Sequence, residues 1–96
     1  MSPSELLAQQ REVILQLAER HGARNVRVFG SIARGDATPE SDVDFLVDME
    51  DGRSFLDLVG FWQDLQDLLG RQVDVISAGG ISPYLRAKIL AEAVPL

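Results

Sequence analysis

The stretch Val26–Val47, with the sequence VRVFGSIARGDATPESDVDFLV, organises the rest of this 96-residue chain. It predicts a strand, a Gly-Ser turn that opens a short helix, a polar loop, and a second strand that carries Asp42 and Asp44. Residues i and i+2 of a strand point to the same face, about 6.5–7 Å apart. Both carboxylates therefore emerge on one side of the sheet, which is the outline of a divalent-cation site.

The turn at Gly30 and Ser31 suits a phosphate. A helix that begins at Ser31 directs unpaired backbone N–H groups and a hydroxyl at the space before it. Glycine at position 30 lets the backbone turn sharply and approach a ligand closely. Taken alone, Gly30 and Gly35 would only punctuate a strand-turn-helix connection. The spaced Asp pair that follows favours a binding site instead, and phosphate and metal together suggest a nucleoside triphosphate.

Gly30-Ser31, ten intervening residues and then Asp42-Val43-Asp44 resemble the signature of the minimal nucleotidyltransferases, a small branch of the DNA polymerase β-like superfamily. The similarity includes Ala33-Arg34-Gly35 inside the spacer and Ser41 before the first Asp. It extends to Val73–Ile76, where the family places a third carboxylate on another strand. The resemblance covers nearly the whole chain, and its motif is far more specific than a lone glycine pattern.

The resemblance implies a polymerase β-like palm, a small mixed sheet with helices packed against it, in a single domain over residues 1–96. It further implies that Gly30 and Ser31 hold the β- and γ-phosphates of ATP. Arg34 would either neutralise phosphate charge or merely cap the turn. Two Mg²⁺ ions would be held by the three carboxylates that are also the implied catalytic residues, Asp42, Asp44 and Asp74. Without the family pattern, Asp74 would be read as an isolated exposed acid.

Apolar periodicities predict the remaining elements. Apolar residues three and four apart indicate a first helix, capped by Ser4 and ended by Gly22, and a second helix over about Ser54–Leu69. Val73–Ile76 alternates as a third strand. Ser82-Pro83 predicts the start of a last helix, with a cap followed by proline at the first helical position. Helices that alternate with short strands indicate an α/β or α+β fold.

Three further residues are expected to have structural roles. His21 is the only histidine and lies beside a helix end, where it is expected to be structural and not catalytic. Gly60 lowers the stability of its helix by up to about 1 kcal/mol relative to Ala, so we expect close packing there. Trp62 is expected to be part of the core and not a platform for stacking a base.

The composition excludes several classes of function. Nine Lys plus Arg against fifteen Asp plus Glu give a formal charge of −6, the wrong sign for a protein that follows a nucleic-acid backbone. The absence of cysteine excludes disulfides and thiolate metal sites. The N-terminus has no apolar signal region, and no stretch reaches the roughly 18 apolar residues of a membrane span. We therefore expect one cytoplasmic domain with neither a nucleic-acid nor a membrane partner.

The implied reaction is an in-line displacement at the α-phosphorus of ATP that transfers AMP and releases pyrophosphate. Stand-alone proteins that look like this one are commonly the antitoxin halves of two-gene modules whose toxin is a HEPN-domain ribonuclease. The resemblance thus implies transfer of AMP to a hydroxyl of such a toxin, with tyrosine as the expected acceptor. Two alternatives remain open. One is a non-catalytic module that masks its partner, and the other is a small-molecule transferase of the aminoglycoside type, for whose acceptor this short chain has little room.

Overall fold

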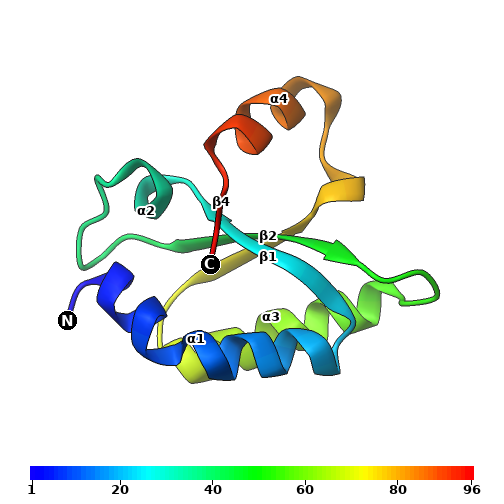
Figure 1. Cartoon of the computed structure of the whole chain (residues 1–96), viewed down its shortest axis with the longest axis horizontal. Coiled ribbons are helices and arrows are strands. Elements are labelled where there is room, and N and C mark those ends of the chain that lie inside the picture. Colours follow the sequence, from blue (N-terminus) through cyan, green and yellow to red (C-terminus); the bar gives the residue numbers. More distant parts are fainter.

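Four strands form one mixed sheet in the order β3-β2-β1-β4 (Figure 1). β1 (Ala23–Phe29) runs antiparallel to β2 (Val43–Met49) and to β4 (Val94–Pro95), whereas β3 (Val73–Ser77) runs parallel to β2. The computed structural model describes all of residues 1–96. The expected class, a small mixed sheet with helices packed against it, is confirmed.

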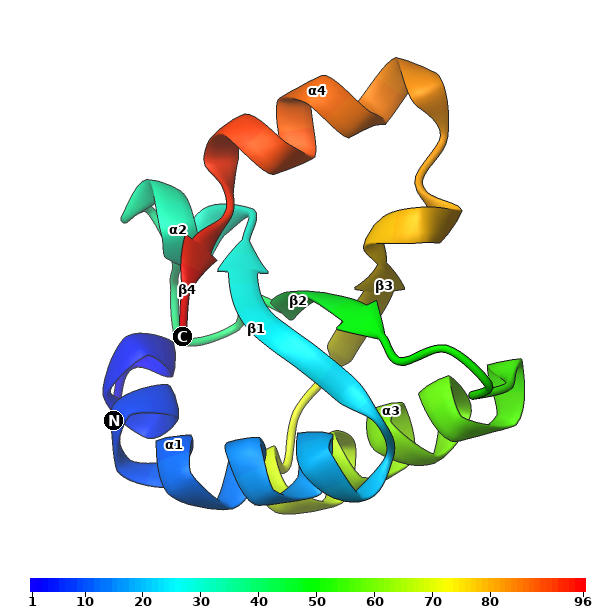
Figure 2. The ribbon, with the colours of Figure 1, turned by 45° about the vertical axis from the view of Figure 1, so that its right-hand side comes forward.

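Helices lie on both faces of this sheet. α1 (Pro3–Arg20) and α3 (Phe55–Leu69) cover one face, and α4 (Pro83–Glu92) lies across the other (Figures 1 and 2). The short α2 (Ser31–Arg34) follows β1, and a 3₁₀ turn over Ala78–Gly80 follows β3. No helix combines the length and the apolar composition that crossing a bilayer would require.

The core lies between the sheet and the pair α1 and α3. Alternation along β2 decides which side chains enter it, because successive strand residues point to opposite faces. Val43, Phe45 and Val47 are fully buried in the core, and this leaves Asp44 on the opposite face, the one that α4 partly covers. The core side chains are Leu7, Ile14, Ala18, Ala23, Val26, Val28, Val43, Phe45, Val47, Phe61, Leu65, Leu69 and Val73.

Helix starts follow the predicted capping chemistry with one exception. Ser54 and Asp57 form a capping box at the start of α3, and Ser82 caps α4 ahead of Pro83. The prediction that Ser4 caps the first helix is wrong, because Ser2 accepts the hydrogen bond from the backbone N–H of Glu5. Proline at the first helical position explains the shift, since the N–H that proline lacks has no partner inside a helix.

β4 is an element that the sequence did not predict. Val94 and Pro95 pair with Val28 and Arg27 of β1, and the backbone N–H of Leu96 donates to the carbonyl of Val26 at 3.1 Å. A two-residue strand has no periodicity of its own. It exists because the free edge of β1 offers unpaired backbone groups.

Gly60 of α3 lies against His21, whose Nε2 is 2.7 Å from a carboxylate oxygen of Asp64. A Cβ at position 60 would lie 2.9 Å from Cε1 of the imidazole ring. The expected close packing at Gly60 and the structural role of His21 are therefore both observed.

Gly60→Ala should lower the free energy of unfolding by about 1 kcal/mol, although Ala is the better helix former, because the imidazole held by Asp64 cannot yield freely. In a His21→Ala background the same change should instead stabilise, by up to about 1 kcal/mol, since only helix propensity remains. Urea unfolding of the four proteins measures both effects. Stabilisation by Gly60→Ala in the wild-type background would contradict the packing argument.

Candidate active site

Asp44 and Asp74 lie side by side on the α4 face of the sheet. The two residues are register partners on the parallel strands β2 and β3. Neighbouring strands are about 4.8 Å apart, so both carboxylates project from adjacent points of the same face. Asp44 is half-buried and Asp74 is exposed. Two residues that are 30 positions apart in the sequence are thus brought together by strand pairing.

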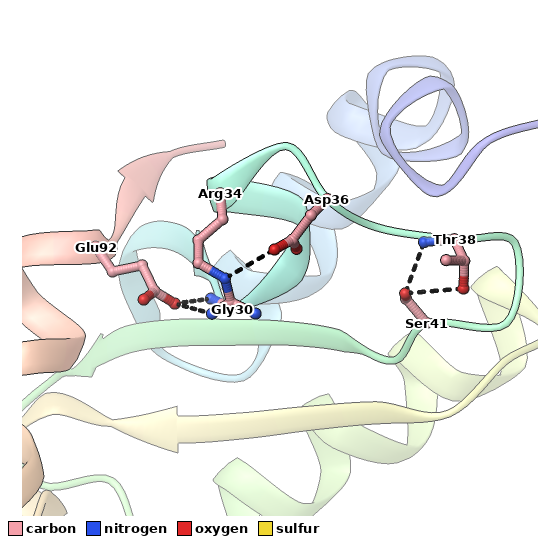
Figure 3. Close-up of polar contacts among 6 residues, drawn as sticks. All are labelled: Gly30, Arg34, Asp36, Thr38, Ser41 and Glu92. Carbon is pink, nitrogen blue, oxygen red and sulfur yellow. Dashed lines mark hydrogen bonds and ion pairs between the residues drawn. The ribbon is translucent and has the colours of Figure 1, made fainter.

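Asp42 lies just before β2, and the sequence-based expectation that the strand includes it is wrong by one residue. The ladder starts at Val43, whose N–H donates to the carbonyl of Gln72 at 3.1 Å. The preceding loop is braced by Ser41, whose hydroxyl accepts from the N–H of Thr38 at 2.8 Å (Figure 3). Asp42 is exposed at the rim of the site, on the end of this braced loop.

The pKa of Asp44 is raised to about 6. Burial is the main cause, because it disfavours the charged form. The negative charge of Asp74 and a hydrogen bond with its side chain follow, then the charge of Asp42, while Arg34 acts in the opposite direction. The negative charges of Asp42 and Asp74 therefore both repel that of Asp44, and a cation between the carboxylates would relieve this repulsion.

The carboxylates of this site offer the oxygen ligands that Mg²⁺ prefers. No group of three or more Asp, Glu, His or Cys side chains is arranged to hold a metal ion without other ligands. Mg²⁺ does not require such a cage, since it commonly binds through one or two carboxylates together with substrate phosphates and water. The adjacent carboxylates of Asp44 and Asp74, with Asp42 at the rim, fit an ion that arrives with a nucleotide.

Gly30 forms the turn that faces Asp44. Its φ of +74° is in the left-handed region, and a Cβ at this position would lie 2.2 Å from Oδ2 of Asp44. Only glycine fits, both for backbone conformation and for space. Ser31 follows as the first residue of α2, so the turn lies directly beside the carboxylate pair.

Arg34 at the end of α2 connects the turn to α4. Its Nε donates to Asp36 at 3.3 Å, and its Nη1 donates to Oε1 of Glu92 at 3.0 Å (Figure 3). These partners, Asp36 first, raise the pKa of the guanidinium. The charge of Arg34 also reaches Asp44.

Glu92 and Lys88 of α4 are site neighbours that sequence reasoning missed. Together with the Gly30 turn they line a cavity of about 190 Å³, whose walls are Phe29, Gly30, Arg34, Leu85, Lys88, Ile89 and Glu92. No local pattern marks them, because α4 follows the motif by some 50 residues and meets it only through the fold.

A second hollow opens on the other side of Asp74. This apolar groove has a volume of about 340 Å³ and is lined by Phe55, Leu58, Val59, Trp62, Asp74 and Val75. Trp62 is half-buried, and its indole N–H donates to the carbonyl of Val73 at 2.7 Å, so it is fixed in the packing between α3 and β3. Asp74 thus lies between the carboxylate of Asp44 and an apolar surface.

Comparison with known proteins places this geometry in a family. The family model described as "Nucleotidyltransferase domain" matches residues 10–96. The chain belongs to the nucleotidyltransferase family. Two relatives carry names for their activity. A Methanocaldococcus jannaschii protein classed as a protein adenylyltransferase is 41% identical over 81 residues, which cover 84% of this chain and 87% of the relative. Protein adenylyltransferase MntA of Thermococcus cleftensis is 39% identical over 79 residues, or 82% and 80%.

Solved structures agree with this assignment. A structure described as a minimal nucleotidyltransferase superposes with a TM-score of 0.85 and 50% identity, over 96% of this chain and 94% of that one. A toxin-antitoxin structure with AMP-PNP superposes with a TM-score of 0.74 over 88% of this chain and 69% of that one. At 21% identity, the second likeness shows the fold alone.

The stability of this nucleotidyltransferase should depend on pH through Asp44. Its pKa is 3.8 in a model peptide and about 6 in the folded protein, so the folded state binds this proton more tightly than the unfolded chain. The stabilisation is fully present below pH 3.8 and is lost as the pH rises through about 6. Because the carboxyl is half-exposed, we expect about 1–2 kcal/mol.

Urea unfolding of the wild type and of Asp44→Asn across this pH range measures the effect. The difference in stability between the two proteins should change by that amount in favour of the variant as the pH rises. A difference that stays constant with pH would contradict the raised pKa.

Proposed function

We propose that this protein is a Mg²⁺-dependent protein adenylyltransferase, which transfers AMP from ATP to a hydroxyl of a partner protein. The observation that carries the proposal is the register pairing of Asp44 with Asp74 directly beside the Gly30 turn. Relatives at 41% and 39% identity carry the name protein adenylyltransferase, and the AMP-PNP complex of a similar fold supports ATP as the donor.

The residues divide into a donor side and an acceptor side. On the donor side, the N–H of Gly30 and the hydroxyl of Ser31 hold phosphate oxygens, and Arg34 offsets their charge. Asp42, Asp44 and Asp74 are the catalytic residues and hold the metal. Bound Mg²⁺ supplies positive charge to the attacking and leaving oxygens of the displacement.

Asp74 is the carboxylate nearest to the acceptor, because it also lines the apolar groove. The acceptor hydroxyl oxygen forms a bond to the α-phosphorus as the bond to pyrophosphate breaks, and the hydroxyl proton passes to Asp74 or to water. A groove with apolar walls suits the ring of a tyrosine better than a polycationic sugar, which would need several polar partners. This favours a protein acceptor over an aminoglycoside.

The proposed partner is a toxin protein of the HEPN class, encoded by a neighbouring gene. Toxin-antitoxin complexes among the solved structures of the same fold support a toxin as the partner. Phe55, which lines the groove, exposes 75% of its surface and offers apolar contact area there. Leu56 and Tyr84 are further exposed apolar side chains, at 78% and 95%. AMP attached to a tyrosine at the toxin's active site would repel RNA and block it, which is how this antitoxin would neutralise its toxin.

Intact-mass measurement of the neighbouring gene's product, after incubation with this protein, ATP and Mg²⁺, tests the proposal. Additions of one or more AMP units, absent with Asp42→Asn and absent with EDTA, are expected. Tight binding without any addition would instead identify a non-catalytic module that masks its partner. Transfer of AMP to a small molecule, with none to the protein, would identify a small-molecule transferase of the aminoglycoside type.

A further inference from the structure

The carboxylate of Glu92, at the end of α4, occupies the Gly30 turn. Its Oε1 accepts a hydrogen bond from the backbone N–H of Gly30 at 2.6 Å and a second from Nη1 of Arg34 at 3.0 Å (Figure 3). The Glu92 side chain is only 17% exposed, so the contact is an enclosed one. A single anionic oxygen therefore takes a main-chain donor and a guanidinium donor at once.

These two donors are the ones that the proposed function assigns to phosphate oxygens of the nucleotide. A carboxylate oxygen and a phosphate oxygen make the same charge-assisted hydrogen bonds to N–H groups and guanidinium. An N–H directed at one enclosed acceptor cannot serve a second anion in the same place. The phosphate chain and Glu92 thus exclude each other at Gly30.

α4 has few buried contacts along its length, and its last turn leads directly into β4, which pairs with β1. Ile89 is its only buried residue, whereas Leu85 and Leu90 expose 52% and 38% of their surface. Lys88 lies one helical turn before Glu92, lines the same cavity and forms no ion pair. A displaced Glu92 would therefore have a cation within reach at the i−4 position of its own helix.

We propose that Glu92 is an internal competitor for the nucleotide's phosphates: it holds the phosphate position of the Gly30 turn in the empty protein and is exchanged for a phosphate oxygen when the nucleotide binds. This inference rests on the proposed function, because it uses the same turn. It adds a residue, outside the motif, that lowers the affinity for the nucleotide and closes the turn when no nucleotide is present.

Calorimetric titration with α,β-methylene-ATP, whose α–β bridge cannot be cleaved in the transfer, tests the exchange. Glu92→Gln keeps the shape of the side chain but removes the charge that competes for Gly30 and Arg34. We expect it to bind the nucleotide about tenfold more tightly than the wild type. Glu19→Gln, on the exposed face of α1, is the matched control for the same change in net charge and should bind within roughly twofold of the wild type.

The resonance of the Gly30 amide gives a second measurement. In ¹⁵N-labelled wild-type protein this amide should move on addition of α,β-methylene-ATP, and in the nucleotide-free Glu92→Gln variant it should already differ from the wild type. If Glu92 instead only braced Arg34 for nucleotide binding, Glu92→Gln would bind more weakly. Equal or weaker binding than in the Glu19→Gln control overturns the inference.

The outcomes also separate the inference from the proposed function. A wild type that binds the nucleotide, with no gain in Glu92→Gln, overturns the competition alone and leaves the transferase proposal intact. Failure of every variant to bind overturns both. Tighter binding of α,β-methylene-ATP by Glu92→Gln, together with no transfer of AMP from ATP to any partner in the mass measurement, supports the competition and counts against the reaction.

Discussion

Asp44→Asn should lower the rate of AMP transfer by at least about 10³-fold, while the protein still folds. Charge stabilisation by a bound metal contributes several kcal/mol to such a displacement, and each 1.36 kcal/mol is a factor of ten in rate. Asp44 is the most enclosed of the three carboxylates, and the charges of the other two both raise its pKa. An amide in its place removes the charge that attracts the cation and keeps nearly the same shape.

The same variant should unfold at higher urea concentration than the wild type at neutral pH without metal. The raised pKa of Asp44 reports that its charge is unfavourable in the folded protein, and the amide does not carry that charge. Pyrophosphate release and urea unfolding are measured side by side. Asp67→Asn, on the exposed side of α3, is the control and should change neither. Mg²⁺-dependent turnover at the wild-type rate in Asp44→Asn would remove this residue from the site.

Gly30→Ala should lower the rate of AMP transfer by about 10²-fold, because it displaces groups of the site instead of removing a charge. The added Cβ would fall 2.2 Å from Oδ2 of Asp44, so either the carboxylate rotates away from Asp74 or the turn opens. Both responses separate the proposed phosphate-binding turn from the carboxylates, and misplacement by about 1 Å can lower a rate by about 10². The positive φ adds a destabilisation of about 1–2 kcal/mol for any residue with a Cβ.

Two control glycines separate the clash from the backbone strain. Gly35→Ala has the same strain, at φ +82°, but its Cβ would meet nothing within 4 Å. Gly79→Ala has neither a positive φ nor a neighbour within 4 Å. Gly35→Ala should therefore lose stability and keep most of its activity, and Gly79→Ala should keep both. If Gly35→Ala lost as much transfer as Gly30→Ala, backbone strain and not the contact with Asp44 would be the cause.

Local chemistry explains what could be predicted without coordinates. Ser54 with Asp57, and Ser82 with Pro83, specify helix starts because the capping partners are within three residues of each other. The prediction was wrong at the first helix, where Ser2-Pro3 has the same pattern as Ser82-Pro83 and Ser2, not Ser4, is the cap. Glycine is unfavourable inside a helix, and this indicated close packing at Gly60. The sequence did not indicate that the packing partner is His21.

Most helices and strands follow from the sequence, as do the glycine turn at Gly30 and the two acids spaced two apart around the start of β2. The folded chain alone shows that Asp74 lies beside Asp44, that Val94 and Pro95 complete the sheet, and that Glu92 reaches the N–H of Gly30. The difference lies in the range of the interactions. Caps, turns and strand alternation depend on neighbours a few residues away, whereas strand register and the position of α4 depend on which apolar surfaces and unpaired backbone groups meet once the chain has folded.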